Sequence, residues 1–100
     1  FIVRKRIDDY SFLIEWNVGD VMRMILIVED DLGIQETLYD LLTMKNYEVK
    51  QAYTIKEALN IDIHDIELII MDIQLPDGNG VTLCQQIRLV SQVPILFLTA

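Results

Sequence analysis

The sequence is poor in cysteine and histidine, with one residue of each, Cys84 and His64. A single cysteine cannot form an intramolecular disulfide, so nothing in the chain points to an oxidising compartment. A zinc site needs several Cys or His ligands close together, and His64 lies in a polar stretch without a second such residue nearby. We therefore expect Cys84 to fill a helix face. Neither residue is expected to bind metal or to take part in catalysis.

Basic residues are scarce too. Eight Lys and Arg residues stand against 16 Asp and Glu residues, which gives a formal net charge of -8. Surfaces that bind nucleic acid need clustered Lys and Arg to neutralise phosphates. This segment is therefore not expected to bind DNA, and contact with DNA would require another part of the protein.

Long apolar runs are absent as well. None approaches the roughly 20 residues of a membrane-spanning helix, and the first stretch lacks the apolar centre and cleavage site of a signal peptide. We expect a soluble, cytoplasmic protein that does not bind a membrane. Its 100 residues allow one domain at most, and an apolar content of 52% is that of a folded chain.

A boundary is expected near Met24. Residues 1–23 hold four basic and four acidic residues, so the whole net charge lies in residues 24–100. The first segment has no regular apolar period, and its apolar residues, Phe12 and Trp16 among them, are followed by no second strand or turn signal. We interpret residues 1–23 as a leader or extension outside the domain, and residues 24–100 as a partial domain.

The origin of the first segment is open. Gly19-Asp20 can be encoded by GGAGAU, which resembles a bacterial ribosome-binding site and lies just upstream of Met22. The segment would then be an untranslated leader read as protein. The alternative is a genuine extension or linker, in which Phe12 and Trp16 could bind a partner. N-terminal sequencing of the natural product would decide, because a start at Phe1 or earlier removes the leader hypothesis.

From Met24 onward, strands and helices are expected to alternate. Residues 24–28, 68–71 and 94–98 are continuous apolar runs, typical of buried parallel strands, and residues 48–52 form a short second strand. Between them lie an apolar helical stripe, a capping box, and a third helix after a turn. This order implies a parallel sheet with helices on both faces. The helix predictions rest on Ile34, Leu38, Leu41, Leu42 and Asn46, then on Thr54 and Glu57, then on Pro76, Gly78, Gly80, Leu83 and Ile87.

Acidic residues stand at the ends of two of these strands, where Glu29-Asp30-Asp31 follows the first and Asp72 the third. Ligands of such sheets lie beyond the carboxyl ends of the strands, where the strand order reverses. If the two strands are neighbours, their carboxylates converge and raise one another's pKa unless a cation offsets the charge. Oxygen ligands of this kind suit Mg²⁺. Asp72 could then attack phosphorus, with Asp30 as metal ligand and the Thr99 hydroxyl as phosphoryl sensor.

Three motifs resemble the receiver domains of two-component response regulators. They are residues 25–31 (ILIVEDD), 68–80 (LIIMDIQLPDGNG) and 93–100 (VPILFLTA), in the order of that family. The resemblance covers residues 24–100. It implies a flavodoxin-like, three-layer α/β fold around a parallel sheet, here without the fourth helix, the fifth strand and the fifth helix.

The resemblance also implies roles for the acidic residues. Asp72 would be the phosphoacceptor and a ligand of Mg²⁺, together with Asp30 and the main-chain carbonyl of Gln74. Glu29 would bind the ion through water, and Thr99 would reorient on phosphorylation. The donor would be a phosphohistidine on a sensor histidine kinase, with small acyl phosphates as substitutes.

The implied protein is a signalling phosphoacceptor that assists its own phosphorylation and dephosphorylation. It would switch an output domain that this chain does not contain, such as a transcription regulator. It could form a homodimer on phosphorylation. Receivers also carry a Lys on the fifth strand, and the chain reaches Ala100 first; Lys45, Lys50 and Lys56 lie in the wrong segments. We expect a fragment with an unpaired sheet edge that binds metal weakly, switches poorly and aggregates.

Two alternatives stay open. A phosphatase of the haloacid dehalogenase type also uses an aspartyl nucleophile, but it requires Asp two residues later, where this chain has Gln74. A receiver-like interaction module that takes no phosphate is opposed only by the acidic cluster. Residues 77–80 resemble a calcium loop but lack its other acidic ligands, so we expect a turn there.

Overall fold

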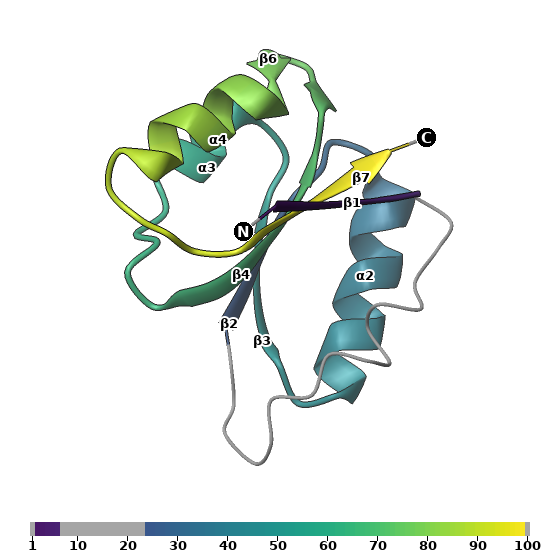
Figure 1. Cartoon of the computed structure of the whole chain (residues 1–100). Helices are drawn as coiled ribbons and strands as arrows, with labels where there is room; N and C mark the ends of the chain where they lie inside the picture. Colours follow the sequence, from purple (N-terminus) through teal and green to yellow (C-terminus); the bar gives the residue numbers. More distant parts are fainter. Residues whose placement is uncertain (1, 7–23, 100) are drawn as a thin grey trace.

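The computed structural model describes residues 2–6 and 24–99, and the side chains of residues 24–98 among them. Within these residues, the larger sheet has five strands, three helices pack around it, and a two-stranded hairpin follows one of the strands (Figure 1). The elements are β1 (Ile2–Arg6), β2 (Met24–Val28), α2 (Leu32–Met44), β3 (Glu48–Ala52), α3 (Ile55–Leu59), β4 (Ile66–Asp72), β5 (Gln74–Leu75), β6 (Gly78–Asn79), α4 (Gly80–Arg88) and β7 (Ile95–Thr99).

The strands of the larger sheet are all parallel and stand in the order β1-β7-β4-β2-β3. From β2 the chain first adds β3 on one side and then returns to place β4 on the other side. The strand order therefore reverses between β2 and β4, and the carboxyl ends of these two strands are where a sheet of this kind binds its ligands.

Helices cover both faces of the sheet, as the alternating pattern predicted (Figure 1). On one face, Leu38 and Leu42 of α2 pack with one set of alternate strand residues. On the other face, Ala58 of α3 and Leu83 and Ile87 of α4 pack with the other set. Because the strands are covered on both sides, β2 and β4 need apolar residues at consecutive positions, and this explains the continuous runs in the sequence.

Local capping sets where the helices begin and end. Thr54 caps α3 as predicted, because its Oγ1 accepts the N–H of Glu57 at 3.0 Å. The Glu57 carboxylate reaches one residue further back than in a capping box and accepts the N–H of Tyr53 at 2.8 Å. Just after α2, Asn46 has a φ of 69°, and the N–H of the following residue, Tyr47, donates to the Leu42 carbonyl at 3.1 Å. The helix ends at Met44, and Asn46, which the sequence analysis expected to end it, supplies the left-handed residue just beyond its C-cap, Lys45.

The strand β1 was not predicted, and it corrects the expectation of an open sheet edge. Residues 2–6 pair in parallel with β7, with Ile2 opposite Ile95 and Arg6 opposite Thr99. In Figure 1 this strand lies beside β7 at the edge of the sheet. The edge of β7 is therefore covered by a segment that we had placed outside the domain. Residues 7–23 lie outside the described part of the chain, so the domain boundary at residue 24 stays a prediction.

Residues 74–79 form the antiparallel hairpin β5-β6, in which Gln74 pairs with Asn79 and Leu75 with Gly78. A turn is present, but it lies at residues 76–77, whereas the sequence analysis placed it at residues 77–80. In the part of the chain that the structure describes, no helix has both the length and the apolar character needed to cross a membrane.

Candidate functional site

The ends of β2 and β4 bring the predicted acidic residues together. In the register of the two neighbouring strands, Val28 pairs with Met71. Glu29 directly follows Val28, and Asp72 is the last residue of β4. The strand pairing therefore places Glu29, Asp30 and Asp72 at the same edge of the sheet, although more than forty residues of chain separate them.

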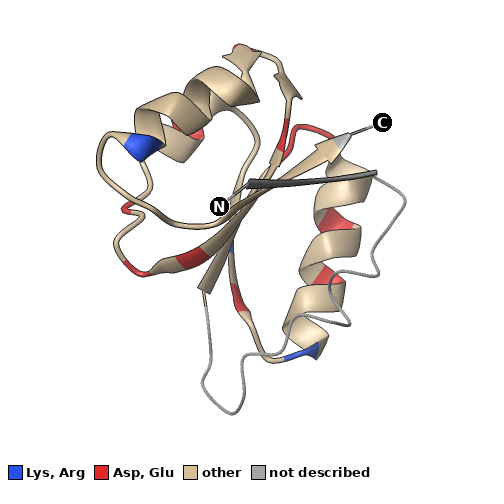
Figure 2. Cartoon of the chain, in the orientation of Figure 1, with Lys and Arg blue, Asp and Glu red and all other residues tan. Residues whose placement is uncertain are grey.

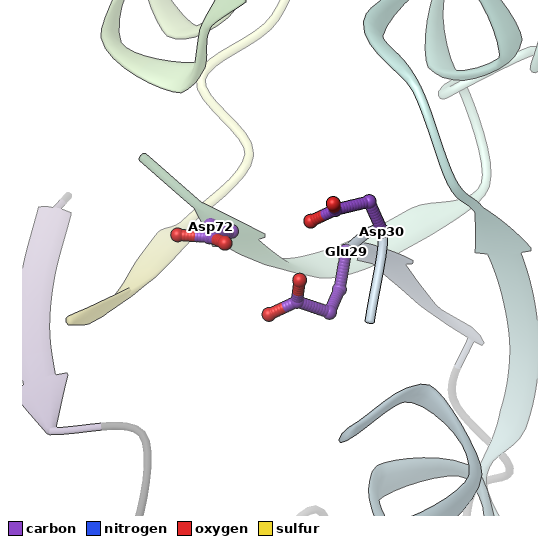
Figure 3. A group of neighbouring side chains, drawn as sticks. All are labelled: Glu29, Asp30 and Asp72. Carbon is purple, nitrogen blue, oxygen red and sulfur yellow. The ribbon is translucent and has the colours of Figure 1, made fainter. Parts of the chain in front are cut away.

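Oxygen atoms of Glu29, Asp30 and Asp72 lie within 4.8 Å of one another. Figure 3 shows Glu29 and Asp30 directing their carboxylates toward Asp72. Among the described residues, acidic segments stand at the turn from β2 into α2 and at the end of β4, without a basic segment beside them (Figure 2). The predicted convergence of these three side chains is therefore present in the structure.

Glu29 differs from the other two acids because its side chain is only 1% exposed. Burial raises its pKa to about 8; the negative charge of Asp72 and the nearby carboxyl groups of Asp30 and Asp72 act in the same direction, whereas the N–H of Asp31 opposes them. That N–H donates to Glu29 Oε2 at 3.1 Å, and Oε1 is buried without a hydrogen-bond partner. A buried oxygen that lacks a donor, next to two further carboxylates, fits a hard divalent cation such as Mg²⁺.

The segment after Asp72 is tightly constrained. Asp72 Oδ1 accepts the N–H of Gln74 at 3.2 Å, and the N–H of Gly80 donates to the Ile73 carbonyl at 2.6 Å. A Cβ atom at Gly80 would overlap the main-chain oxygen of Asp72. Glycine is therefore required where α4 begins, because the hairpin folds back directly onto the end of β4.

The loop is also tied to α3 by Asp77, whose carboxylate accepts the N–H groups of Ile55 at 2.8 Å and Lys56 at 3.0 Å. These two hydrogen bonds hold the pKa of Asp77 below its usual range. The sequence had suggested only a turn here. The structure adds that the turn is fastened to the preceding helix, α3, at a point five residues from Asp72.

Gln35 is a residue that the sequence analysis missed. It lies in α2 on the same side as Leu38 and Leu42, is 1% exposed, and donates hydrogen bonds to main-chain carbonyls at the ends of β2 and β3. We had assigned the apolar stripe to Ile34, Leu38, Leu41 and Leu42; Leu38 and Leu42 are buried as predicted, whereas Ile34 and Leu41 are only partly buried. A glutamine three residues before Leu38 and seven before Leu42 was the signal that could have revealed it.

The other residues singled out from the sequence are less fully defined. Thr99 is the last residue of β7, but its side chain lies outside the described part of the structure. Cys84 is buried in α4, as expected for a helix-filling residue. His64 is exposed between β3 and β4, and the group of metal-ligating side chains at Glu29, Asp30 and Asp72 does not include it.

Comparisons with known proteins identify the fold and the family. The model of the response regulator receiver domain matches residues 25–100. The chain belongs to this family. Among the curated relatives, the transcriptional regulatory protein YrkP of Bacillus subtilis is 47% identical over 76 residues, which cover 76% of this chain and 33% of that protein. The chain thus spans about one third of the length of this relative.

Solved receiver structures resemble this receiver in fold. The non-phosphorylated receiver domain of HemR from Leptospira biflexa has a TM-score of 0.73 and 44% identity, over 78% of this chain and 64% of that chain. The response regulator MaeR, solved bound to beryllium trifluoride, has a TM-score of 0.64 and 30% identity, over 78% of this chain and 66% of that chain. The flavodoxin-like receiver fold is thereby confirmed, and the phosphatase alternative gains no support.

Proposed function

We propose that this receiver domain accepts a phosphoryl group on Asp72 in a reaction that requires Mg²⁺. The observation that carries the proposal is the convergence of Glu29, Asp30 and Asp72 within 4.8 Å at the ends of two neighbouring strands. The bound beryllium trifluoride of MaeR supports it, because that compound resembles a phosphoryl group in shape and charge. Asp30, Asp72 and the main-chain carbonyl of Gln74 would hold the ion, and Glu29 would contact it through water.

The proposed chemistry is a phosphoryl transfer between two nucleophiles. An oxygen of Asp72 attacks phosphorus, a P–O bond forms, and the P–N bond to the donor imidazole breaks. The electron pair of the P–N bond stays on that nitrogen, and the other ring nitrogen of the phosphohistidine already carries a proton, so the histidine leaves as neutral imidazole. Bound Mg²⁺ would offset the negative charge of the phosphoryl group and of the carboxylates around it. The hydrogen bond from the Gln74 N–H to Asp72 Oδ1 orients the nucleophile, and Thr99 would contact the transferred group.

The partners follow from the same proposal. The donor is the phosphohistidine of a sensor histidine kinase, and small acyl phosphates serve as substitutes. By analogy with YrkP, the phosphorylated domain would control transcription through a region outside these residues. A cytoplasmic location, and a homodimer that forms on phosphorylation, also belong to this proposal.

The test is to incubate the chain with acetyl phosphate and Mg²⁺ and to measure its intact mass. We expect a gain of one phosphoryl group, located on Asp72 by peptide mapping and absent when a chelator removes the metal. Asp72→Asn should lose the gain. The matched control is Asp40→Asn, because Asp40 is an exposed aspartate of α2 outside the acidic cluster.

Two results would contradict the proposal. Equal labelling of the wild type and Asp72→Asn would assign the phosphoryl group to another residue. An unchanged mass of a folded chain would favour the receiver-like interaction module that takes no phosphate.

A further inference from the structure

Gln35 is buried beside the acidic cluster and makes an unusually complete set of hydrogen bonds. Its Nε2 donates to the carbonyl of Ala52 at 2.8 Å and to that of Glu29 at 3.0 Å, and lies 3.3 Å from the carbonyl of Ile27. Its Oε1 accepts from Gln51 Nε2 at 3.0 Å. Both amide protons and the amide oxygen therefore have partners, so a polar group can be buried in the core without an unsatisfied atom.

Two of the three carbonyls that Gln35 bonds, those of Glu29 and Ala52, lie where the sheet pairing stops. β2 ends at Val28 and β3 at Ala52, so the Glu29 carbonyl is beyond the last paired position of its strand. The peptide group of that carbonyl joins Glu29 to Asp30, and both residues contribute carboxylates to the cluster. Whatever holds this peptide group also sets the positions from which the two side chains reach Asp72.

We propose that Gln35 is a positioning residue, which holds the Glu29–Asp30 peptide group so that both carboxylates share a single ion with Asp72. The inference rests on the Mg²⁺ site of the proposed function. A purely structural role would make Gln35 important for stability alone. The two roles differ in what a replacement changes while the chain is still folded.

The decisive variant is Gln35→Met, which keeps the length of the side chain and removes both donors. In this variant the Ala52 carbonyl keeps the N–H of Glu29 at 3.0 Å, whereas the Glu29 carbonyl loses the side-chain donor that holds it. The disturbance therefore falls on the peptide group between the two acids. Loss of a group that orients metal ligands typically weakens metal binding about 10- to 100-fold.

The experiment measures Mg²⁺ affinity by calorimetry and stability by urea unfolding, in the same samples. We expect Gln35→Met to weaken Mg²⁺ binding about tenfold or more. Leu42→Ala removes a buried side chain from the far end of the same helix, so it should lower stability at least as much and leave the affinity unchanged. Gln51→Met, which removes only the donor to Gln35 Oε1, should change the affinity little.

A measurement on the wild type covers the case in which Gln35→Met does not fold. Addition of Mg²⁺ should shift the side-chain amide signals of Gln35 in NMR spectra together with the backbone signals of Glu29 and Asp30. The exposed Gln85 side-chain amide serves as the control and should not respond.

The outcomes separate the inference from the proposed function. If the backbone signals respond and the Gln35 amide does not, or if Leu42→Ala weakens Mg²⁺ binding as much as Gln35→Met, the positioning role is wrong. If wild-type backbone signals at the cluster also fail to respond, the Mg²⁺ site is wrong, and the positioning role falls with it.

Discussion

The interiors of β2 and β4 and the carboxyl ends of the same strands are built from opposite kinds of residues. Residues 25–28 and 68–71 are apolar and buried, and they pack with helices on both faces of the sheet. An acidic residue follows each apolar run, Glu29 after residues 25–28 and Asp72 after residues 68–71. Glu29 is as deeply buried as the residues of the core. A single strand register thus both builds the core and brings the like charges together.

Because of this difference, residues that stabilise the fold and residues that would bind the metal lie only a few positions apart in each strand. Burial of apolar surface stabilises the strand interiors, whereas close carboxylates, one of them buried, destabilise the strand ends unless a cation is bound. Variants in the interior should therefore change stability without changing metal affinity. Variants at the ends should do the reverse.

The largest effect is expected inside β4. Ile70 is fully buried on the face that α2 covers. Ile70→Ala should lower the free energy of unfolding by about 2–5 kcal/mol, because it leaves a cavity and removes apolar contacts. Urea unfolding measures this. Leu89→Ala, at an exposed position, is the control and should cost about 0.5 kcal/mol or less. A cost of similar size in both variants would argue against this placement of the core.

A smaller effect is expected where the interior meets the end. At Gly80 an added Cβ overlaps the main-chain oxygen of Asp72, so Gly80→Ala should lower stability by about 1–3 kcal/mol and also weaken Mg²⁺ binding. Gly33→Ala is the matched control, because its Cβ would meet only the Asp31 carboxylate at 3.2 Å. Thermal unfolding and a Mg²⁺ titration of both variants check this. Equal losses of stability and of Mg²⁺ affinity in the two variants would mean that Gly80 does not lie against the main chain of Asp72.

At the strand end itself, Asp30→Asn should weaken Mg²⁺ binding at least tenfold, or by about 1.4 kcal/mol. Its stability without metal should change by about 0.5 kcal/mol or less, because Asp30 is exposed. Asp31→Asn is the control: Asp31 caps α2 by accepting the N–H of Ile34 at 3.0 Å, and Asn caps helices equally well. If calorimetry shows the same affinity loss for both variants, Asp30 is not a specific ligand.

The smallest effect concerns Asp77, which fastens the hairpin to α3. Its folded pKa is lowered, so its contribution to stability is present above the ordinary pKa of Asp and is lost as the pH falls through the lowered value. Asp77→Asn should therefore be less stable than the wild type near pH 7, and the gap should close below about pH 4. Unfolding curves across this range test the sign. Asp62→Asn is the control, because the Asp62 side chain accepts only the local N–H of His64 and the oxygen of Asn can accept it too, so this variant should keep the stability of the wild type.

Much of the fold could be predicted from the sequence because its signals are local. Continuous apolar runs indicated β2, β4 and β7, and Thr54 with Glu57 marked the start of α3. The convergence of Glu29, Asp30 and Asp72 was predictable as well, since parallel strands bring their carboxyl ends to the same edge of a sheet.

What could not be predicted depends on pairings between distant segments. Nothing in residues 2–6 indicates that they pair with β7, because a short strand at a sheet edge is stabilised by its neighbour rather than by its own pattern. The role of Gln35 depends on carbonyls of β2 and β3, which no sequence period reveals. The bonds from Asp77 to α3 likewise join segments about twenty residues apart.

The central claim is that carboxylates from two strands share one divalent ion. It can be tested directly with crystals of the chain grown with Mn²⁺, whose anomalous scattering locates the metal. The account predicts a single anomalous peak between the ends of β2 and β4, within coordination distance of both Asp30 and Asp72. A folded chain without a peak there, or with a peak that contacts acids of one strand only, would contradict it.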